Sequence, residues 1–172
     1  MSFVGSLLAG CSSMLSAGEN VLYSDWNGSA RSLESVNIIS PDGRNRYLAG
    51  ARAHPGGPDY LPISPGGFQY FAENGHRVPD QVAISWRELP PPGAEPYTGE
   101  LKGPYTVDVR SRIPKDVLPM AGRDGYALTL MFSVGELPIL FNWRLIAFGK
   151  VTGKGIQKLR CGGDAPDRHC KN

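Results

Sequence analysis

The stretch that decides the fold is residues 126–148, which read YALTLMFSVGELPILFNWRLIAF. In its first part large apolar residues stand at alternate positions: Tyr126, Leu128, Leu130, Phe132 and Val134. Its second part, residues 139–148, is apolar on both faces apart from Asn142 and Arg144. A period of two predicts strands, and the connector 135–138 has the length of a hairpin loop. We therefore predict an antiparallel pair at the centre of a sheet, with the second strand buried on both faces.

Shorter segments on either side also predict strands. Residues 81–89 alternate cleanly, and residues 105–113 repeat this pattern. Residues 36–39 and 47–53 flank the turn sequence Ser-Pro-Asp-Gly, which predicts a hairpin. Residues 114–121 predict one short helix. The spacing indicates a mainly β fold, an antiparallel β-sandwich with one short helix, in a single domain over residues 21–172 that follows a tether of residues 1–20.

Length and composition exclude several classes of protein. The 172 residues contain 22 Gly and 15 Pro. Together these make up about 22% of the chain, against a usual share of about 12%, and this excess disfavours a helical bundle. The formal net charge is only +2, so a generally basic nucleic-acid-binding protein is excluded. The chain has no run of about 18 apolar residues, so we predict no membrane-spanning helix.

The N-terminal sequence contains a possible lipidation site. Leu8-Ala9-Gly10-Cys11 matches the bacterial lipobox, in which the thiol of the cysteine carries lipid, and small polar residues follow it. No Lys or Arg precedes Cys11, and the apolar stretch is short for a signal sequence. Either the natural start lies upstream, or the match arises by chance and the segment is a frayed end with a buried cysteine.

The other two cysteines, Cys161 and Cys170, flank a turn-rich stretch. We predict that they form a disulfide, which would persist in an oxidising compartment such as the periplasm. Free thiols and a metal site that adds His169 are the alternatives. The paired C-x-x-C spacing of structural zinc sites is missing here, so we predict no metal.

Motifs for catalysis are scarce in this sequence. It has no Gly-x-Ser-x-Gly elbow, His-Glu-x-x-His motif, P-loop or dinucleotide-binding fingerprint. We therefore predict no enzyme activity, no catalytic residue and no cofactor. His54 and His76 are expected to be exposed turn residues. A hydrolase would require one of them within hydrogen-bonding reach of a Ser or Asp.

Arginine and tyrosine gather around two long loops, residues 52–67 and 87–104. These residue types are enriched at protein interface hot spots, and loops on a rigid scaffold often carry function. The candidate partner-binding residues are Arg52, Tyr60, Arg87, Glu88, Tyr97, Lys102, Arg110 and Arg112. Simple packing over a strand end is the alternative for Tyr97, and a solvated strand face is the alternative for Arg110 and Arg112.

Four segments resemble a known group of proteins: VAISWRELPPPG at 82–93, PYTG at 96–99, GPY at 103–105 and VRSRIP at 109–114. With the lipobox, they look like the small proteobacterial lipoproteins that are encoded beside type VI secretion effectors. These lipoproteins are immunity proteins, and the likeness is best with those that guard against lipase and phospholipase effectors. The likeness covers roughly residues 80–148.

The resemblance implies a periplasmic, lipid-anchored protein that binds and inhibits a secreted lipase-type effector and thereby protects the producing cell. No nucleic acid is an expected partner, and the membrane is contacted only through the lipid anchor. The alternative is a cell-envelope lipoprotein that binds a small ligand or scaffolds an envelope assembly, which predicts a concave apolar pocket.

Overall fold

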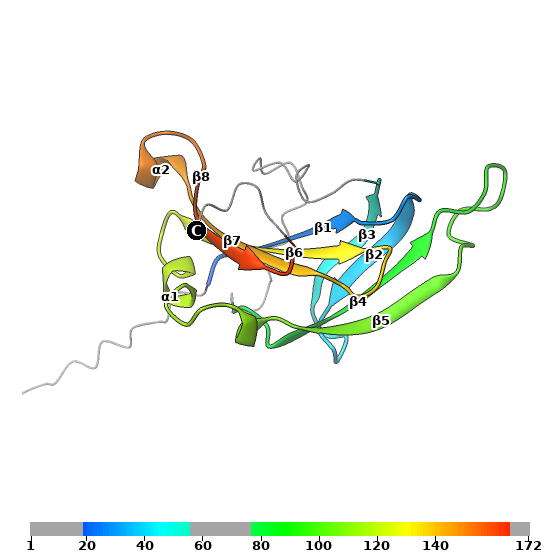
Figure 1. Ribbon diagram of the computed structural model, residues 1–172, viewed down its shortest axis with the longest axis horizontal. Helices are drawn as coiled ribbons and strands as arrows, with labels where there is room; N and C mark the ends of the chain where they lie inside the picture. The colour runs from blue at the N-terminus through cyan, green and yellow to red at the C-terminus, as the bar shows by residue number, and fades with distance from the viewer. Residues whose placement is uncertain (1–18, 56–76, 166–172) are drawn as a thin grey trace, which may run out of the picture.

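Two four-stranded sheets pack face to face in the computed structural model, which describes residues 19–55 and 77–165 (Figure 1). The first sheet contains, in spatial order, β1 (Val21–Asn27), β6 (Tyr126–Val134), β7 (Phe141–Ala147) and β8 (Gln157–Gly163). The second contains β3 (Arg46–Ala53), β2 (Leu33–Ile39), β4 (Gln81–Glu88) and β5 (Leu101–Asp108). The predicted mainly β sandwich is confirmed.

The helical segments are short. A 3-10 turn, η2 (Arg110–Arg112), follows β5, and α1 (Leu118–Ala121) precedes β6. The helix predicted over residues 114–121 therefore begins only at Leu118. A second four-residue helix, α2 (Gly149–Thr152), was not predicted; it ends at Gly153, whose positive φ of 67° suits glycine. None of the helices described is long and apolar enough to cross a membrane.

The central pair is the predicted hairpin of β6 and β7. These strands are antiparallel, with Leu130 opposite Trp143 and Phe132 opposite Phe141. The rings of Phe132 and Phe141 lie 5.2 Å apart, centroid to centroid, and both side chains are fully buried. Every residue of β7 is buried, which confirms that this strand is covered on both faces. Burial of a large apolar side chain such as Phe132 or Phe141 stabilises the fold by about 1.5–3 kcal/mol.

One pairing differs from the purely antiparallel arrangement that the sequence predicted. β1 runs parallel to β6, in register from Val21 opposite Leu128 to Asn27 opposite Val134. All the other strand pairs are antiparallel. No hairpin fixes the direction of β1, because about 100 residues separate the two strands and the chain passes through the second sheet between them.

The strand predicted over residues 105–113 is shifted toward the N-terminus. β5 begins at Leu101, which pairs with Arg87, and it ends at Asp108. It is an edge strand, so Pro104 is tolerated although proline has no backbone N–H to donate. The predicted loop 87–104 consequently shrinks to the connection 89–100 between β4 and β5.

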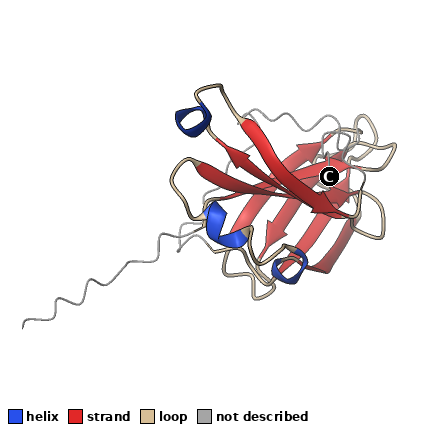
Figure 2. Ribbon diagram, turned by 60° about the vertical axis from the view of Figure 1, so that its left-hand side comes forward, coloured by secondary structure: helices blue, strands red, loops and turns tan. Residues whose placement is uncertain are grey.

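Connections gather at two opposite ends of the sandwich (Figure 2). We call residues 28–32, 89–100 and 135–140 the loop end; there the N–H of Gly28 bonds to the carbonyl of Val134, and that of Leu89 to the carbonyl of Ser32. We call residues 109–125 and 148–160 the helix end. It holds η2, α1 and α2, and the N–H of Phe148 bonds to the carbonyl of Gly125 there.

Candidate functional site

A buried asparagine organises the turn between β1 and β2 at the loop end. Asn27 Oδ1 accepts hydrogen bonds from the backbone N–H of Ser29 (2.9 Å) and from its hydroxyl (2.8 Å). Asn27 Nδ2 donates to the carbonyls of Arg31 (2.5 Å) and Ala53 (3.1 Å), which ties the turn to β3. Buried amides are satisfied in this way at little cost. The turn therefore holds Arg31 in a defined position.

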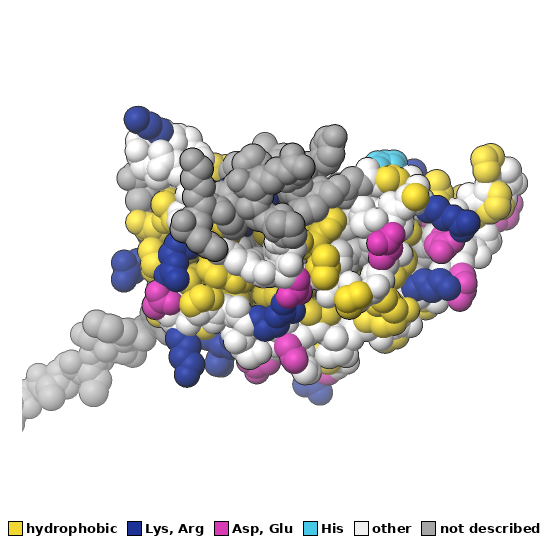
Figure 3. Space-filling view, viewed as in Figure 1, with side chains coloured by type: hydrophobic (Ala, Val, Ile, Leu, Met, Phe, Trp, Pro, Cys, Tyr) yellow, Lys and Arg dark blue, Asp and Glu magenta, His cyan; other side chains and the backbone are white. Residues whose placement is uncertain are grey.

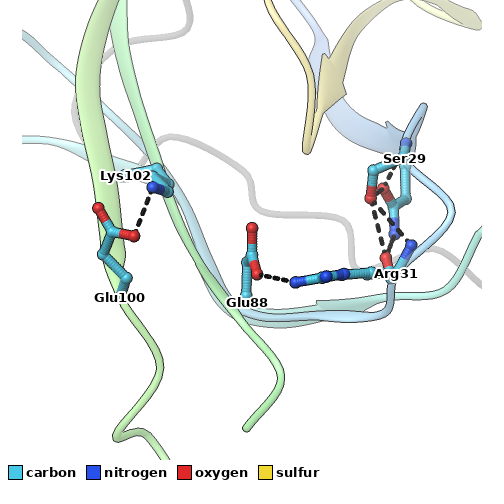
Figure 4. A network of polar contacts seen from close by, with 6 residues as sticks. Ser29, Arg31, Glu88, Glu100 and Lys102 are labelled. Carbon is cyan, nitrogen blue, oxygen red and sulfur yellow. Dashed lines mark hydrogen bonds and ion pairs between the residues drawn. The ribbon is translucent and has the colours of Figure 1, made fainter.

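Two ion pairs lie on the same end (Figure 4). Arg31 Nη1 contacts Glu88 Oε2 at 2.8 Å, and Lys102 Nζ contacts Glu100 Oε2 at 2.6 Å. The hydrogen bond to Glu100 raises the pKa of Lys102. Exposed pairs of this kind add little to stability. Their contribution is to place two positive and two negative side chains around the base of the β4–β5 connection.

The β4–β5 connection is itself fixed by internal hydrogen bonds. Arg87 Nη1 donates to the carbonyl of Gly99 at 2.7 Å, and Thr98 Oγ1 donates to the carbonyl of Glu95 at 2.7 Å. Gly99 also packs so closely that a Cβ there would overlap the backbone oxygen of Glu88. The absence of a side chain at Gly99 thus allows the returning chain to lie against the end of β4.

This close approach makes Gly99 sensitive to substitution. Gly99→Ala is expected to lower the free energy of unfolding by about 1–3 kcal/mol, because the added methyl must displace the chain. Amide hydrogen exchange in residues 89–100 should become faster. The matched control is Gly28→Ala at the same end, where a Cβ would meet atoms only at ordinary contact distances, the nearest being 3.8 Å away. Equal stability of the two variants would contradict the prediction.

Large apolar side chains are exposed at the loop end and at the adjoining first residue of β5. They are Leu89 (47% exposed), Tyr97 (58%), Leu101 (50%) and Leu137 (59%). Figure 3 shows apolar side chains reaching the tip of the β4–β5 connection. Tyr97 has a positive φ of 62°, a conformation that non-glycine residues adopt at a cost of order 1 kcal/mol or more. The surface therefore combines exposed apolar groups with a fixed, strained backbone.

The structure brings four of the predicted partner-binding residues together. Arg87, Glu88, Tyr97 and Lys102 all lie on or beside the β4–β5 connection at the loop end. Arg52 is exposed on β3, close to the same end, where Ala53 pairs with Leu33. Tyr60 lies outside the described residues.

Arg110 and Arg112 lie instead at the opposite end of β5, in η2. Arg110 makes a two-pronged ion pair with Glu19, at 3.0 and 3.1 Å, and Nη1 donates to the carbonyl of Val78 at 2.9 Å. Arg112 pairs with Asp164, and its guanidinium carbon lies 5.0 Å from the ring centre of Phe141. Both side chains thus hold distant segments of this chain together.

The remaining sequence predictions fall partly outside the described residues. Cys161 lies in β8, but Cys11 and Cys170 lie outside, so lipidation and the disulfide stay predictions. His76 lies outside as well. Among the residues that are described, no group of three or more His, Cys, Asp or Glu side chains could hold a metal ion.

One contact that the sequence did not reveal joins Ser32 to His54. The Ser32 hydroxyl lies 3.3 Å from His54 Nδ1, and both side chains are exposed to solvent to some extent. His54 is exposed, as predicted. Within the described part of the chain, no carboxylate bonds to its other ring nitrogen. The contact provides a serine and a candidate base, but it lacks the third group that orients the base in a catalytic triad.

Comparisons of this chain with models of protein families, with curated proteins and with solved structures found no match. The fold and the site define the class of the protein as a β-sandwich with a structured, partly apolar loop end.

Proposed function

We propose that this protein is a binding protein that inhibits a secreted lipase-type effector by covering part of its surface with the loop end. In this proposal it is a periplasmic immunity protein, anchored by lipid on Cys11 and stabilised by a disulfide between Cys161 and Cys170. The observation that carries the proposal is the exposure of Leu89 and Tyr97 on the β4–β5 connection and of Leu101 directly after it.

The chemistry of the loop end suits a protein partner. Large apolar side chains and tyrosine supply most of the binding energy at protein interfaces, and charged groups around them set orientation and the rate of encounter. Arg31, Glu88 and Lys102 provide such charges here. Because hydrogen bonds already fix the connection, less conformational entropy is lost on binding.

The nature of the partner is inferred from the resemblance. Four segments resemble lipase-effector immunity proteins, and three of them lie on β4, the β4–β5 connection and part of β5. These three are residues 82–93, 96–99 and 103–105. The likeness is therefore concentrated on the hairpin that carries the proposed binding surface. An inhibitor of this kind needs no chemistry of its own, since it only has to block the catalytic cleft or the lipid-facing surface of the effector.

Mutation of the exposed Tyr97 tests directly whether the loop end is the binding surface. Tyr97→Ala is expected to weaken binding to the lipase-type effector encoded beside this protein by about 30-fold, the equivalent of about 2 kcal/mol. Inhibition of lipase activity should fall in parallel. Binding is measured by calorimetry with the full chain, and both proteins are purified separately.

The matched control is Leu159→Ala, which truncates an exposed apolar side chain on β8, away from the loop end. It should leave the affinity unchanged. If Leu159→Ala weakened binding as much as Tyr97→Ala, the inhibitory surface would lie elsewhere. If the wild-type chain did not bind the effector at all, the alternative of an envelope lipoprotein with a small ligand would take precedence.

The contact between Ser32 and His54 supports a second candidate function, serine hydrolysis. A fluorophosphonate probe, which reacts with activated serines, tests it without knowledge of the substrate. For the binding-protein proposal we expect no labelling of the folded chain above that of Ser32→Ala. Stoichiometric labelling that disappears in Ser32→Ala and in His54→Ala would establish the hydrolase instead.

A further inference from the structure

We infer that the helix end binds an anionic lipid surface. The inference goes beyond the proposed inhibition, because it concerns the opposite end of the molecule and a different ligand. Residues 109–125 and 148–160 contain eight Lys and Arg residues but only two acidic residues, a net formal charge of +6. The whole chain has a net charge of only +2. Positive charge is therefore concentrated at one end.

Part of this charge is exposed to solvent. Lys115, Arg123 and Lys154 are exposed. Figure 3 shows several Lys and Arg side chains at the end that Figure 1 labels with α1 and α2. Two of the eight cations are neutralised from outside the segments, Arg110 by Glu19 and Arg112 by Asp164. When these two carboxylates are included, the helix end still has a net formal charge of +4.

Apolar groups lie among the basic ones. Leu159, 43% exposed, stands between Lys158 and Arg160 on β8, and Pro119 is exposed on α1. Arg160 contacts Asp116 at 2.5 Å, which joins β8 to the segment before α1. Basic residues that are interspersed with exposed apolar groups suit the headgroup region of a bilayer, where charge attracts the protein and small apolar groups can insert.

The position of the chain at Asn20 favours a membrane as the occupant of this surface. The N–H of Asn20 bonds to the carbonyl of Ala121 at 2.9 Å, and its side-chain amide donates to the carbonyl of Tyr126 at 2.9 Å. The described chain therefore begins at the helix end, and Cys11 precedes this point in the sequence. A bilayer that faced this end would leave the β4–β5 connection and the rest of the loop end directed away from it (Figure 1).

Vesicle binding tests the inference without the effector and without a lipid anchor. The probe is the full chain with Cys11→Ser, which cannot be lipidated, mixed with vesicles of phosphatidylcholine or with vesicles in which about a third of the lipid is phosphatidylglycerol. We expect binding to the anionic vesicles only, lost in concentrated salt. Lys115→Gln/Arg123→Gln/Lys154→Gln should weaken it by about tenfold or more, since each basic residue near the surface contributes to the attraction.

Two matched variants control for charge and for folding. Arg31→Gln/Arg52→Gln/Lys102→Gln removes the same charge from the loop end and should bind like the parent chain. Lys115→Arg/Arg123→Lys/Lys154→Arg keeps the charge and should also bind. Equal weakening by both charge-removing variants, or equal binding to neutral and anionic vesicles, would overturn the inference. Binding of double-stranded DNA as tight as that of anionic vesicles would also overturn it, because the surface would then recognise polyanions in general.

Discussion

Asp25→Asn is expected to stabilise the protein at pH 7.5 by up to about 3 kcal/mol. Asp25 stands on the inner face of β1, opposite Phe132 of β6. Burial raises the pKa of its carboxyl from 3.8 to about 6, although a bond to its own backbone partly opposes the shift. The charged form is thus unfavourable in the folded state, and the neutral amide avoids this penalty.

The sign of the pH dependence follows from the same shift. Between pH 3.8 and about 6 the folded protein keeps a proton on Asp25 that the unfolded chain has lost, so the free energy of unfolding falls as pH rises. The stabilisation that protonated Asp25 provides relative to charged Asp25 is complete below this pH window and is lost above it. Asp25→Asn should remove this slope.

Urea denaturation at pH 4.5 and at pH 7.5 measures the effect of Asp25→Asn. Asp80→Asn, at an exposed carboxylate that precedes β4, is the control and should keep the wild-type slope. A wild-type stability that rises through the window, or an Asp25→Asn variant that keeps the wild-type slope, would contradict the assignment.

Phe132→Ala is expected to destabilise the fold by about 3–5 kcal/mol. The ring is fully buried and packs on Phe141 at the centre of the first sheet, where it faces the second sheet. Its removal leaves a cavity that strands held by hydrogen bonds on both sides cannot close. A loss of this size would unfold many domains of this length at 37 °C.

Chemical denaturation of Phe132→Ala and of Phe132→Leu separates the size of the cavity from the loss of an apolar group. The leucine keeps most of the volume, so its cost should be about half that of alanine or less. The slope of the free energy with denaturant should stay constant across the three proteins. Equal costs for the two variants would mean that the aromatic contact with Phe141 dominates, not the cavity.

The central hairpin could be predicted from sequence because its information is local. In residues 126–148, alternation, a short connector and a fully apolar second strand all point to the same pair. The parallel pairing of β1 with β6 could not be predicted in this way. A strand pattern shows which face is buried but not which distant strand lies beside it. The early start of β5 was missed because Pro104 suggested a loop.

The candidate site shows the same division. Arg87, Glu88, Tyr97 and Lys102 lie near one another because they stand on or beside a single connection. The alternation over residues 105–113 predicts that Arg110 lies on the outward face of a strand. The chain leaves the sheet after Asp108, and the partner of Arg110 is Glu19, 91 residues away in sequence. The exposed Leu89 and Leu101 were missed, since leucine beside a strand is normally a core residue.

The parallel pairing of β1 also determines how the molecule would bear a mechanical load. Glu19 and Asn20 attach the chain at the helix end, and β1 runs from there toward the loop end. Tension between an anchor at Glu19 and a partner gripped at the loop end would act along β1. The seven residue pairs between β1 and β6 would then be sheared together, not peeled apart one after another. Such a domain would stay folded, and keep its partner bound, under forces that separate the strands of a hairpin one residue pair at a time.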